Sequence, residues 1–76
     1  RALDYEFCIP RGNRFATEVL GIDPSARLVA KSPGRIGCPG DQWLVIGSTH
    51  QPGFRAVLRR LSALPYVKRV EQTFYE

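Results

Sequence analysis

The C-terminal half of the chain, residues 41–76, carries the pattern that most limits how the protein can fold. An apolar run at 43–46 is followed by a break that contains glycine and proline, and then by apolar residues that recur at helical spacing. Those residues are Phe54, Val57, Leu58, Leu61 and Leu64. Pro65 ends this stretch, after which residues 67–75 have the composition of a strand. The pattern predicts strand, helix at 52–64, strand.

The N-terminal half predicts the remaining elements. Apolar residues at 3, 5, 7 and 9 alternate with polar ones, which is typical of a strand with one buried face. A short helix over 14–20 follows, with Asn13 as its N-cap and Gly21 as its stop. Residues 26–31 predict a second strand, and the proline- and glycine-rich segment 32–40 predicts a loop.

The complete order is βαββαβ, so we predict an α+β, ferredoxin-like fold: a four-stranded antiparallel sheet with both helices on one face. A chain of 76 residues forms one domain at most, here residues 1–76. Its hydrophobic fraction of 43% and charged fraction of 24% are ordinary for a globular domain. No apolar run approaches the roughly 18 residues that span a bilayer. We therefore expect no membrane association, and a cytoplasmic location.

The two cysteines, Cys8 and Cys38, have no metal-ligand spacing. A disulfide between them is possible, but we favour two reduced thiols packed as small apolar groups. The single histidine, His50, lies in a loop, and the carboxylates show no paired spacing. We predict no metal, no cofactor and no catalytic residues, hence a protein that is not an enzyme.

A basic patch is predicted around the second helix and the start of the last strand. It consists of Arg55, Arg59, Arg60, Lys68 and Arg69. With a net charge of +4 and a pI of about 9.6, it could meet phosphate or carboxylate, although such a run is more often the solvated face of a helix. Nucleic-acid binding is permitted but not favoured, because Asp4 and Glu6 would place negative charge on the open sheet face.

Trp43 has two possible orientations. If Leu44 and Ile46 face the helices, Trp43 and Val45 lie on the open face of the sheet. They would then mark an interface, because exposing a tryptophan side chain to solvent is energetically unfavourable. In the opposite register Trp43 belongs to the core. The first register predicts an interface anchored by Trp43 and Val45, with Asp4 and Glu6 at its rim.

Residues 40–46, 61–65 and 67–71 together resemble the effector-sensing domain of leucine-responsive (feast/famine) transcription regulators and the related ACT domains. In that family a Gly-Asp pair enters the third strand, as Gly40 and Asp41 do here. A second aspartate is common where this chain has Trp43. The resemblance implies sheet-to-sheet dimerisation and a small-molecule or protein signal, with Gly40 and Asp41 near the ligand loop.

The phrase from Leu64 to Glu71 also resembles the propeptides of subtilisin-type proteases, in which an extended tail, here 72–76, occupies the protease cleft. This resemblance implies an inhibitor or folding chaperone, and secretion. Our first interpretation is a non-enzymatic regulatory module that associates through its sheet, as a homodimer or with a larger protein. The propeptide is the second, and a basic nucleic-acid-binding module is the third.

Overall fold

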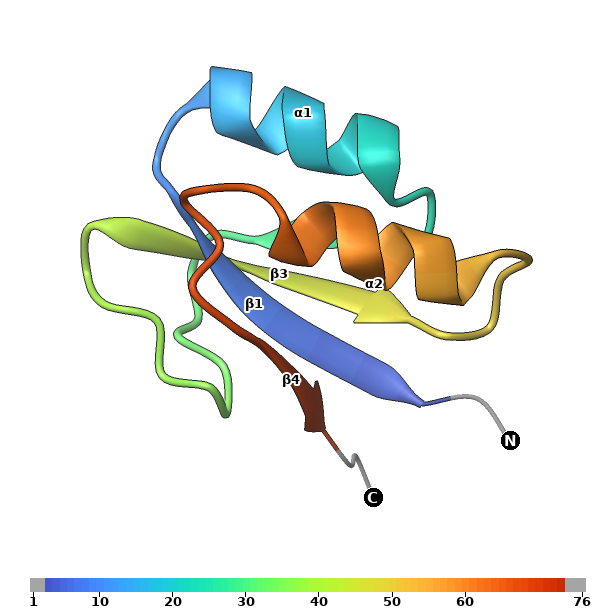
Figure 1. Ribbon diagram of the computed structural model, residues 1–76. Helices are drawn as coiled ribbons and strands as arrows, with labels where there is room; N and C mark the ends of the chain where they lie inside the picture. Colours follow the sequence, from blue (N-terminus) through green and yellow to red (C-terminus); the bar gives the residue numbers. More distant parts are fainter. Residues whose placement is uncertain (1–2, 74–76) are drawn as a thin grey trace.

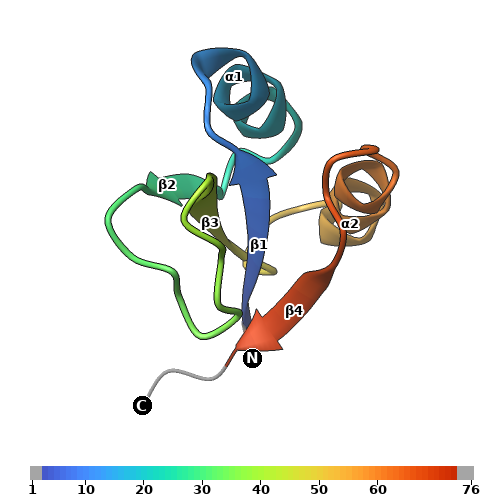
Figure 2. The same cartoon turned by 90° about the vertical axis from the view of Figure 1, so that its left-hand side faces the viewer.

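The computed structural model describes residues 3–73, and within this range it contains four strands and two helices (Figure 1). In chain order they are β1 (Asp4–Pro10), α1 (Asn13–Ile22), β2 (Arg27–Val29), β3 (Gln42–Ser48), α2 (Phe54–Ser62) and β4 (Val70–Thr73). The strands form one antiparallel sheet in the order β2-β3-β1-β4. Both helices lie on the same face of that sheet (Figure 2). The ferredoxin-like α+β arrangement predicted from the sequence is confirmed.

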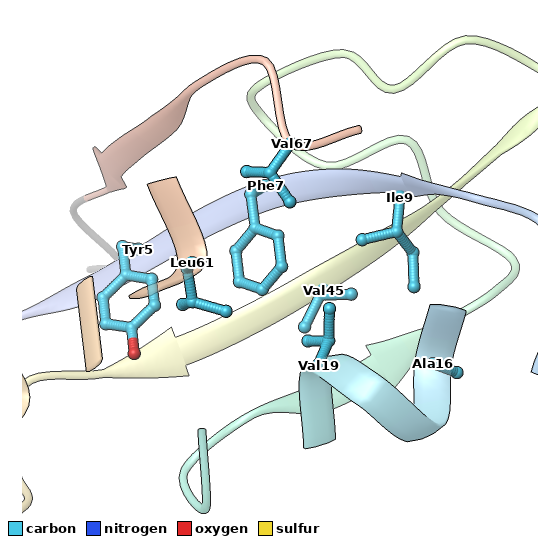
Figure 3. Close-up of a cluster of buried hydrophobic side chains, with 8 residues drawn as sticks. All are labelled: Tyr5, Phe7, Ile9, Ala16, Val19, Val45, Leu61 and Val67. Carbon is cyan, nitrogen blue, oxygen red and sulfur yellow. The ribbon is translucent and has the colours of Figure 1, made fainter. Parts of the chain in front are cut away.

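The main core lies between the sheet and the helices. Tyr5, Phe7 and Ile9 point from β1 toward the helices, because alternate residues of a strand share one face. The eight buried side chains of this cluster are Tyr5, Phe7, Ile9, Ala16, Val19, Val45, Leu61 and Val67 (Figure 3). Each helix therefore contributes a narrow apolar stripe, as the amphipathic spacing predicts.

The opposite face of the sheet is covered in part by the segment between β2 and β3. We call residues 30–41 the strap. Its Ile36 and Cys38 are buried against Leu44 of β3 in a second, smaller apolar cluster. Cys8, Val29 and Ile46 pack around that cluster. The loop was predicted, but its folding back over the sheet was not.

The helix ends differ from the predicted ones. In α1 the N-cap is Gly12 rather than Asn13, and no side chain makes a capping hydrogen bond. The helix passes through Gly21 and ends at Ile22, where the N–H of Asp23 donates to the carbonyl of Val19. Tertiary contacts hold this end, so the glycine that we expected to stop the helix is accommodated within it.

The second helix is shorter than predicted. It begins at Phe54, with Gly53 as its N-cap, and ends at Ser62, so Pro52 and Leu64 lie outside it. Leu64 still packs against the main core. The strand β2 is shorter than predicted, at three residues, and β4 begins at Val70 rather than at residue 67. Residues 74 and 75, which the sequence assigns to the last strand, lie outside the described residues.

Candidate functional site

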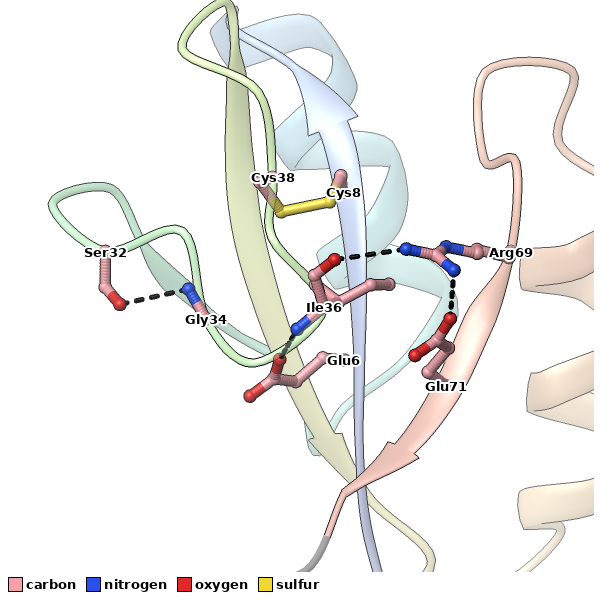
Figure 4. The surroundings of a disulfide bond; sticks show 8 residues. All are labelled: Glu6, Cys8, Ser32, Gly34, Ile36, Cys38, Arg69 and Glu71. Atoms are coloured by element: carbon pink, nitrogen blue, oxygen red, sulfur yellow. Dashed lines mark hydrogen bonds and ion pairs between the residues drawn. A yellow bond between two sulfur atoms is a disulfide. The ribbon is translucent and has the colours of Figure 1, made fainter.

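A disulfide joins Cys8 of β1 to Cys38 of the strap, with their Cα atoms 5.6 Å apart. This separation is typical of a disulfide. Our expectation of two reduced thiols was wrong, because the strap folds back onto β1 and brings the two cysteines within bonding distance. The bridge closes the loop between residues 30 positions apart and anchors the strap to the centre of the sheet (Figure 4).

Polar contacts hold the middle of the strap as well. The N–H of Ile36 donates to the carboxylate of Glu6 at 3.0 Å, and the carbonyl of Ile36 accepts from Arg69 at 3.1 Å. Arg69 also forms an ion pair with Glu71 of β4 (Figure 4). Glu6, which we expected at the rim of an interface, is only 1% exposed and lies under the strap.

A cleft of about 280 Å³ opens beside the disulfide. It lies between the strap and the connection from α2 to β4. Its lining residues are Cys8, Ile36, Gly37, Pro39, Gln42, Lys68 and Arg69. One wall is therefore apolar and the other carries two cations, an arrangement suited to an organic anion.

The predicted ligand-loop residues lie at the end of the strap. Gly40 and Asp41 are both exposed and directly precede β3. The carbonyl of Gly40 accepts a hydrogen bond of 2.9 Å from Nε of Arg11. Gly40 also lines a shallow hollow of about 390 Å³ on the side of the strap near Arg11 and Lys31.

Trp43 and Val45 do not lie on the open face of the sheet. Val45 is 1% exposed within the helix-side core, and Trp43 is half-buried against the same core. The register pairs them with Ile9 and Phe7 of β1, whose side chains also face the helices. The interface orientation of Trp43 and Val45 is therefore wrong, and the core orientation is correct. Asp4 is half-buried at the far end of β1.

The predicted basic patch is divided between two parts of the molecule. Arg55, Arg59 and Arg60 are exposed along α2, on the helix layer. Arg69 instead reaches the strap on the other side of the sheet, and Lys68 lines the same cleft. The structure thus provides an arginine surface on α2 and, separately, a small cationic cleft.

Burial makes the surface more basic than the formal charge indicates. All ten lysine and arginine residues within the described range are exposed. Of the six acidic residues in that range, Glu6 and Asp23 are buried. Ten cations therefore share the surface with four acidic side chains.

Asp23 is the centre of a buried polar network that the sequence did not reveal. Its carboxylate accepts hydrogen bonds from the hydroxyl of Tyr5, the N–H and hydroxyl of Ser25, and the amide of Gln51. The distances to Ser25 are 2.9 and 2.7 Å, and the amide lies at 3.0 Å. The amide of Gln51 also donates to the carbonyl of Ser48 at 2.8 Å. The network joins β1, the turn after α1 and the loop after β3, which is a structural role.

Tyr5 and Tyr66 hold their protons strongly. Burial, together with the hydrogen bond to Asp23, raises the pKa of Tyr5. Partial burial and a hydrogen bond to Glu18 raise the pKa of Tyr66 to about 12. Both hydroxyls therefore act as neutral donors at physiological pH. Neither is positioned as a general base.

Close approach explains a glycine in β3. The ring of Tyr5 lies over Gly47, where a Cβ atom would come within 2.5 Å of it. Any side chain at this position would displace Tyr5 from Asp23. The requirement is visible only once β1 and β3 are paired.

His50 is exposed, and its backbone N–H donates to the hydroxyl of Ser48 at 3.0 Å. Within residues 3–73 no group of three or more histidine, cysteine, aspartate or glutamate side chains is placed to hold a metal ion. In the same range, neither helix is long and apolar enough to cross a membrane.

No protein-family model, no curated protein and no solved structure matches the chain.

Proposed function

We propose that the chain is a non-enzymatic interaction module that binds an acidic protein surface through the arginine side of α2. The observation that carries this proposal is the exposure of every described cation together with the burial of Glu6 and Asp23. Such a surface attracts and steers acidic partners. Arg55, Arg59 and Arg60 form its most compact part, on one helix.

The charge of Arg55 opposes the stability of α2, whereas Arg59 and Arg60 lie in the last turn, where the helix dipole favours cations. Arg55 lies in the first turn, where the helix dipole disfavours a cation, and it is spaced i, i+4 from Arg59. The first turn contains no acidic residue that would compensate. Together these effects cost about 0.5–1 kcal/mol. An arginine at position 55 is therefore consistent with a binding role.

Several features favour a protein partner over nucleic acid. The strap covers much of the sheet face on which a fold of this kind would stack bases, and Glu6 lies beneath it. Arginine recognises carboxylates in a bidentate manner. The disulfide suits an oxidising compartment rather than the cytoplasm, which also supports a protein partner.

The same features argue against the other associations considered above. Two copies of this basic surface would repel each other, which disfavours a homodimer formed through α2. The strap also occupies the sheet face that a subtilisin propeptide would pack against its enzyme. Residues 74–76 of the proposed inhibitory tail lie outside the described residues.

The proposal can be tested with a fluorescent oligoglutamate peptide, a duplex DNA of equal charge and fluorescence anisotropy. We expect the peptide to bind, and Arg55→Glu/Arg59→Glu to weaken it about tenfold or more, because two charge-assisted contacts are lost. The matched control, Arg27→Glu/Lys31→Glu, changes the same charge on and beside β2 and should weaken binding much less. Equal losses in both variants, or tighter binding of the DNA with a steep salt dependence, would overturn the proposal.

A further inference from the structure

The cleft beside the disulfide is separate from the arginine surface of α2 and has its own chemistry. It is lined by the cations Lys68 and Arg69, by Gln42, and by the apolar residues Ile36, Pro39 and Cys8. We propose that this cleft binds a monocarboxylate that carries a short apolar body.

Two contacts on opposite sides hold the guanidinium of Arg69 in place. One terminal nitrogen donates to the carbonyl of Ile36 at 3.1 Å, and the other pairs with Glu71. A guanidinium has five N–H donors, so these contacts leave donors free for a ligand. The side chain remains largely accessible, at 61% exposure, so a ligand can reach it from solvent. Arg69 is therefore oriented without being saturated.

The charge of the cleft selects a monoanion. Glu71 compensates Arg69, and within residues 3–73 no ion pair is found for Lys68, the other cation that lines the cleft. One carboxylate would neutralise it. A phosphate dianion would bring a second negative charge close to Glu71, which like-charge repulsion disfavours.

The apolar wall favours a ligand whose carboxylate is attached to a hydrocarbon group. Ile36, Pro39 and Cys8 would contact a hydrocarbon chain, and burying that chain is favourable. The volume, about 280 Å³, lies just below the range of pockets that enclose drug-sized ligands. A branched aliphatic acid of side-chain size fits this description.

The experiment uses ¹⁵N-labelled protein, with the disulfide intact, and titrations followed by NMR. The probes are 4-methylpentanoate, its neutral amide and inorganic phosphate. We expect saturable shifts of the backbone N–H signals of Gly37, Gln42 and Lys68 with the carboxylate, and weaker effects with the other two probes. Equal shifts with the amide, binding of phosphate as tight as that of the carboxylate, or no saturable shifts at all would each overturn the proposal.

Two variants distinguish a specific binding site from a general effect of the protein's net charge. Lys68→Gln should weaken the carboxylate about tenfold, the scale of one charge-assisted contact. Arg59→Gln removes one cation from α2 and should change the affinity less than about twofold, since exposed charges at a distance are screened. Equal weakening in both variants would show that only net charge matters. The two proposals can be refuted independently. The oligoglutamate assay reports on Arg55 and Arg59, whereas the carboxylate titration reports on Lys68.

Discussion

The backbone N–H of Ile36 donates to the carboxylate of Glu6 at 3.0 Å, and Glu6 is only 1% exposed. A buried carboxylate is costly unless hydrogen bonds satisfy it. Glu6 meets this requirement with a donor that belongs to the strap, so the strap and the sheet each satisfy a polar group of the other. Together with the disulfide, this contact makes the strap part of the folded structure rather than a loose loop.

Replacing Glu6 with alanine should therefore loosen the strap. The N–H of Ile36 would lose its partner within the protein, which costs about 1–3 kcal/mol for a buried donor. Urea unfolding should show this loss, and amide hydrogen exchange should show faster exchange at Ile36 than elsewhere. The control is Asp41→Ala, which removes an exposed carboxylate from the end of the strap. If both variants unfold alike, Glu6 contributes no more than a surface charge.

Removing the disulfide should be the most destabilising change in the strap. For a loop of this length the chain-entropy model assigns the bridge about 3–4 kcal/mol. We expect Cys8→Ala/Cys38→Ala to lower the free energy of unfolding by this order, and to abolish carboxylate binding because the cleft loses a wall. Reduction of the native protein by a dithiol should reproduce both effects. A reduced protein as stable as the oxidised one would contradict this role.

Gly34 is the position in the strap where a side chain is least tolerable. Its φ is +69°, and a Cβ atom would lie 2.7 Å from both Glu6 Oε1 and Leu44 Cδ1. Gly34→Ala should therefore lower the melting temperature, through backbone strain of about 1 kcal/mol and displacement of the strap. Gly40→Ala is the matched control, because a Cβ atom there meets nothing within 4 Å. Similar melting temperatures for the two variants would show that the strap shifts without cost.

The sequence predicted those parts of the fold that depend on local periodicity. Alternation in β1 and helical spacing in α2 are visible in neighbouring residues, so the element order and the burial of Phe7 and Leu61 could be predicted. The register of β3 could not, because four successive apolar residues fit either face. The location of Trp43 depended on this register and was left open.

The candidate sites were less predictable because they depend on contacts between distant residues. The disulfide requires the strap to fold back over β1, and the cleft requires Lys68 to lie beside Pro39. Asp23 resembles an ordinary turn residue in the sequence, and only the approach of Tyr5 and Gln51 reveals its burial. One signal was available: Asp23 and Ser25 flank a proline, which is typical of a turn with side-chain hydrogen bonds.

Stability should decrease as the pH rises above about 10, the ordinary pKa of tyrosine. Tyr5 and Tyr66 have raised pKa values in the folded protein, so between pH 10 and about 12 the folded state binds more protons than the unfolded state. Linkage then requires the free energy of unfolding to fall across this window. Urea unfolding at a series of pH values measures it. Tyr5→Phe removes the larger of the two shifts and should flatten the dependence. An unchanged slope in this variant would assign the effect to other groups.

Arg55→Glu should stabilise the protein while it weakens binding to an acidic partner. A glutamate in the first turn of α2 interacts favourably with the helix dipole, and it forms an i, i+4 pair with Arg59 instead of repelling it. We expect a gain of about 0.5–1 kcal/mol in the free energy of unfolding. Arg55→Gln removes the cation without adding an acid. Its free energy of unfolding should therefore lie between those of the native protein and Arg55→Glu. The guanidinium of Arg55 lies 5.4 Å from the ring centroid of Phe54, a contact that both variants lose. If both variants are less stable than the native protein, this cation–π contact outweighs the unfavourable charge, and Arg55 is retained for folding rather than for binding.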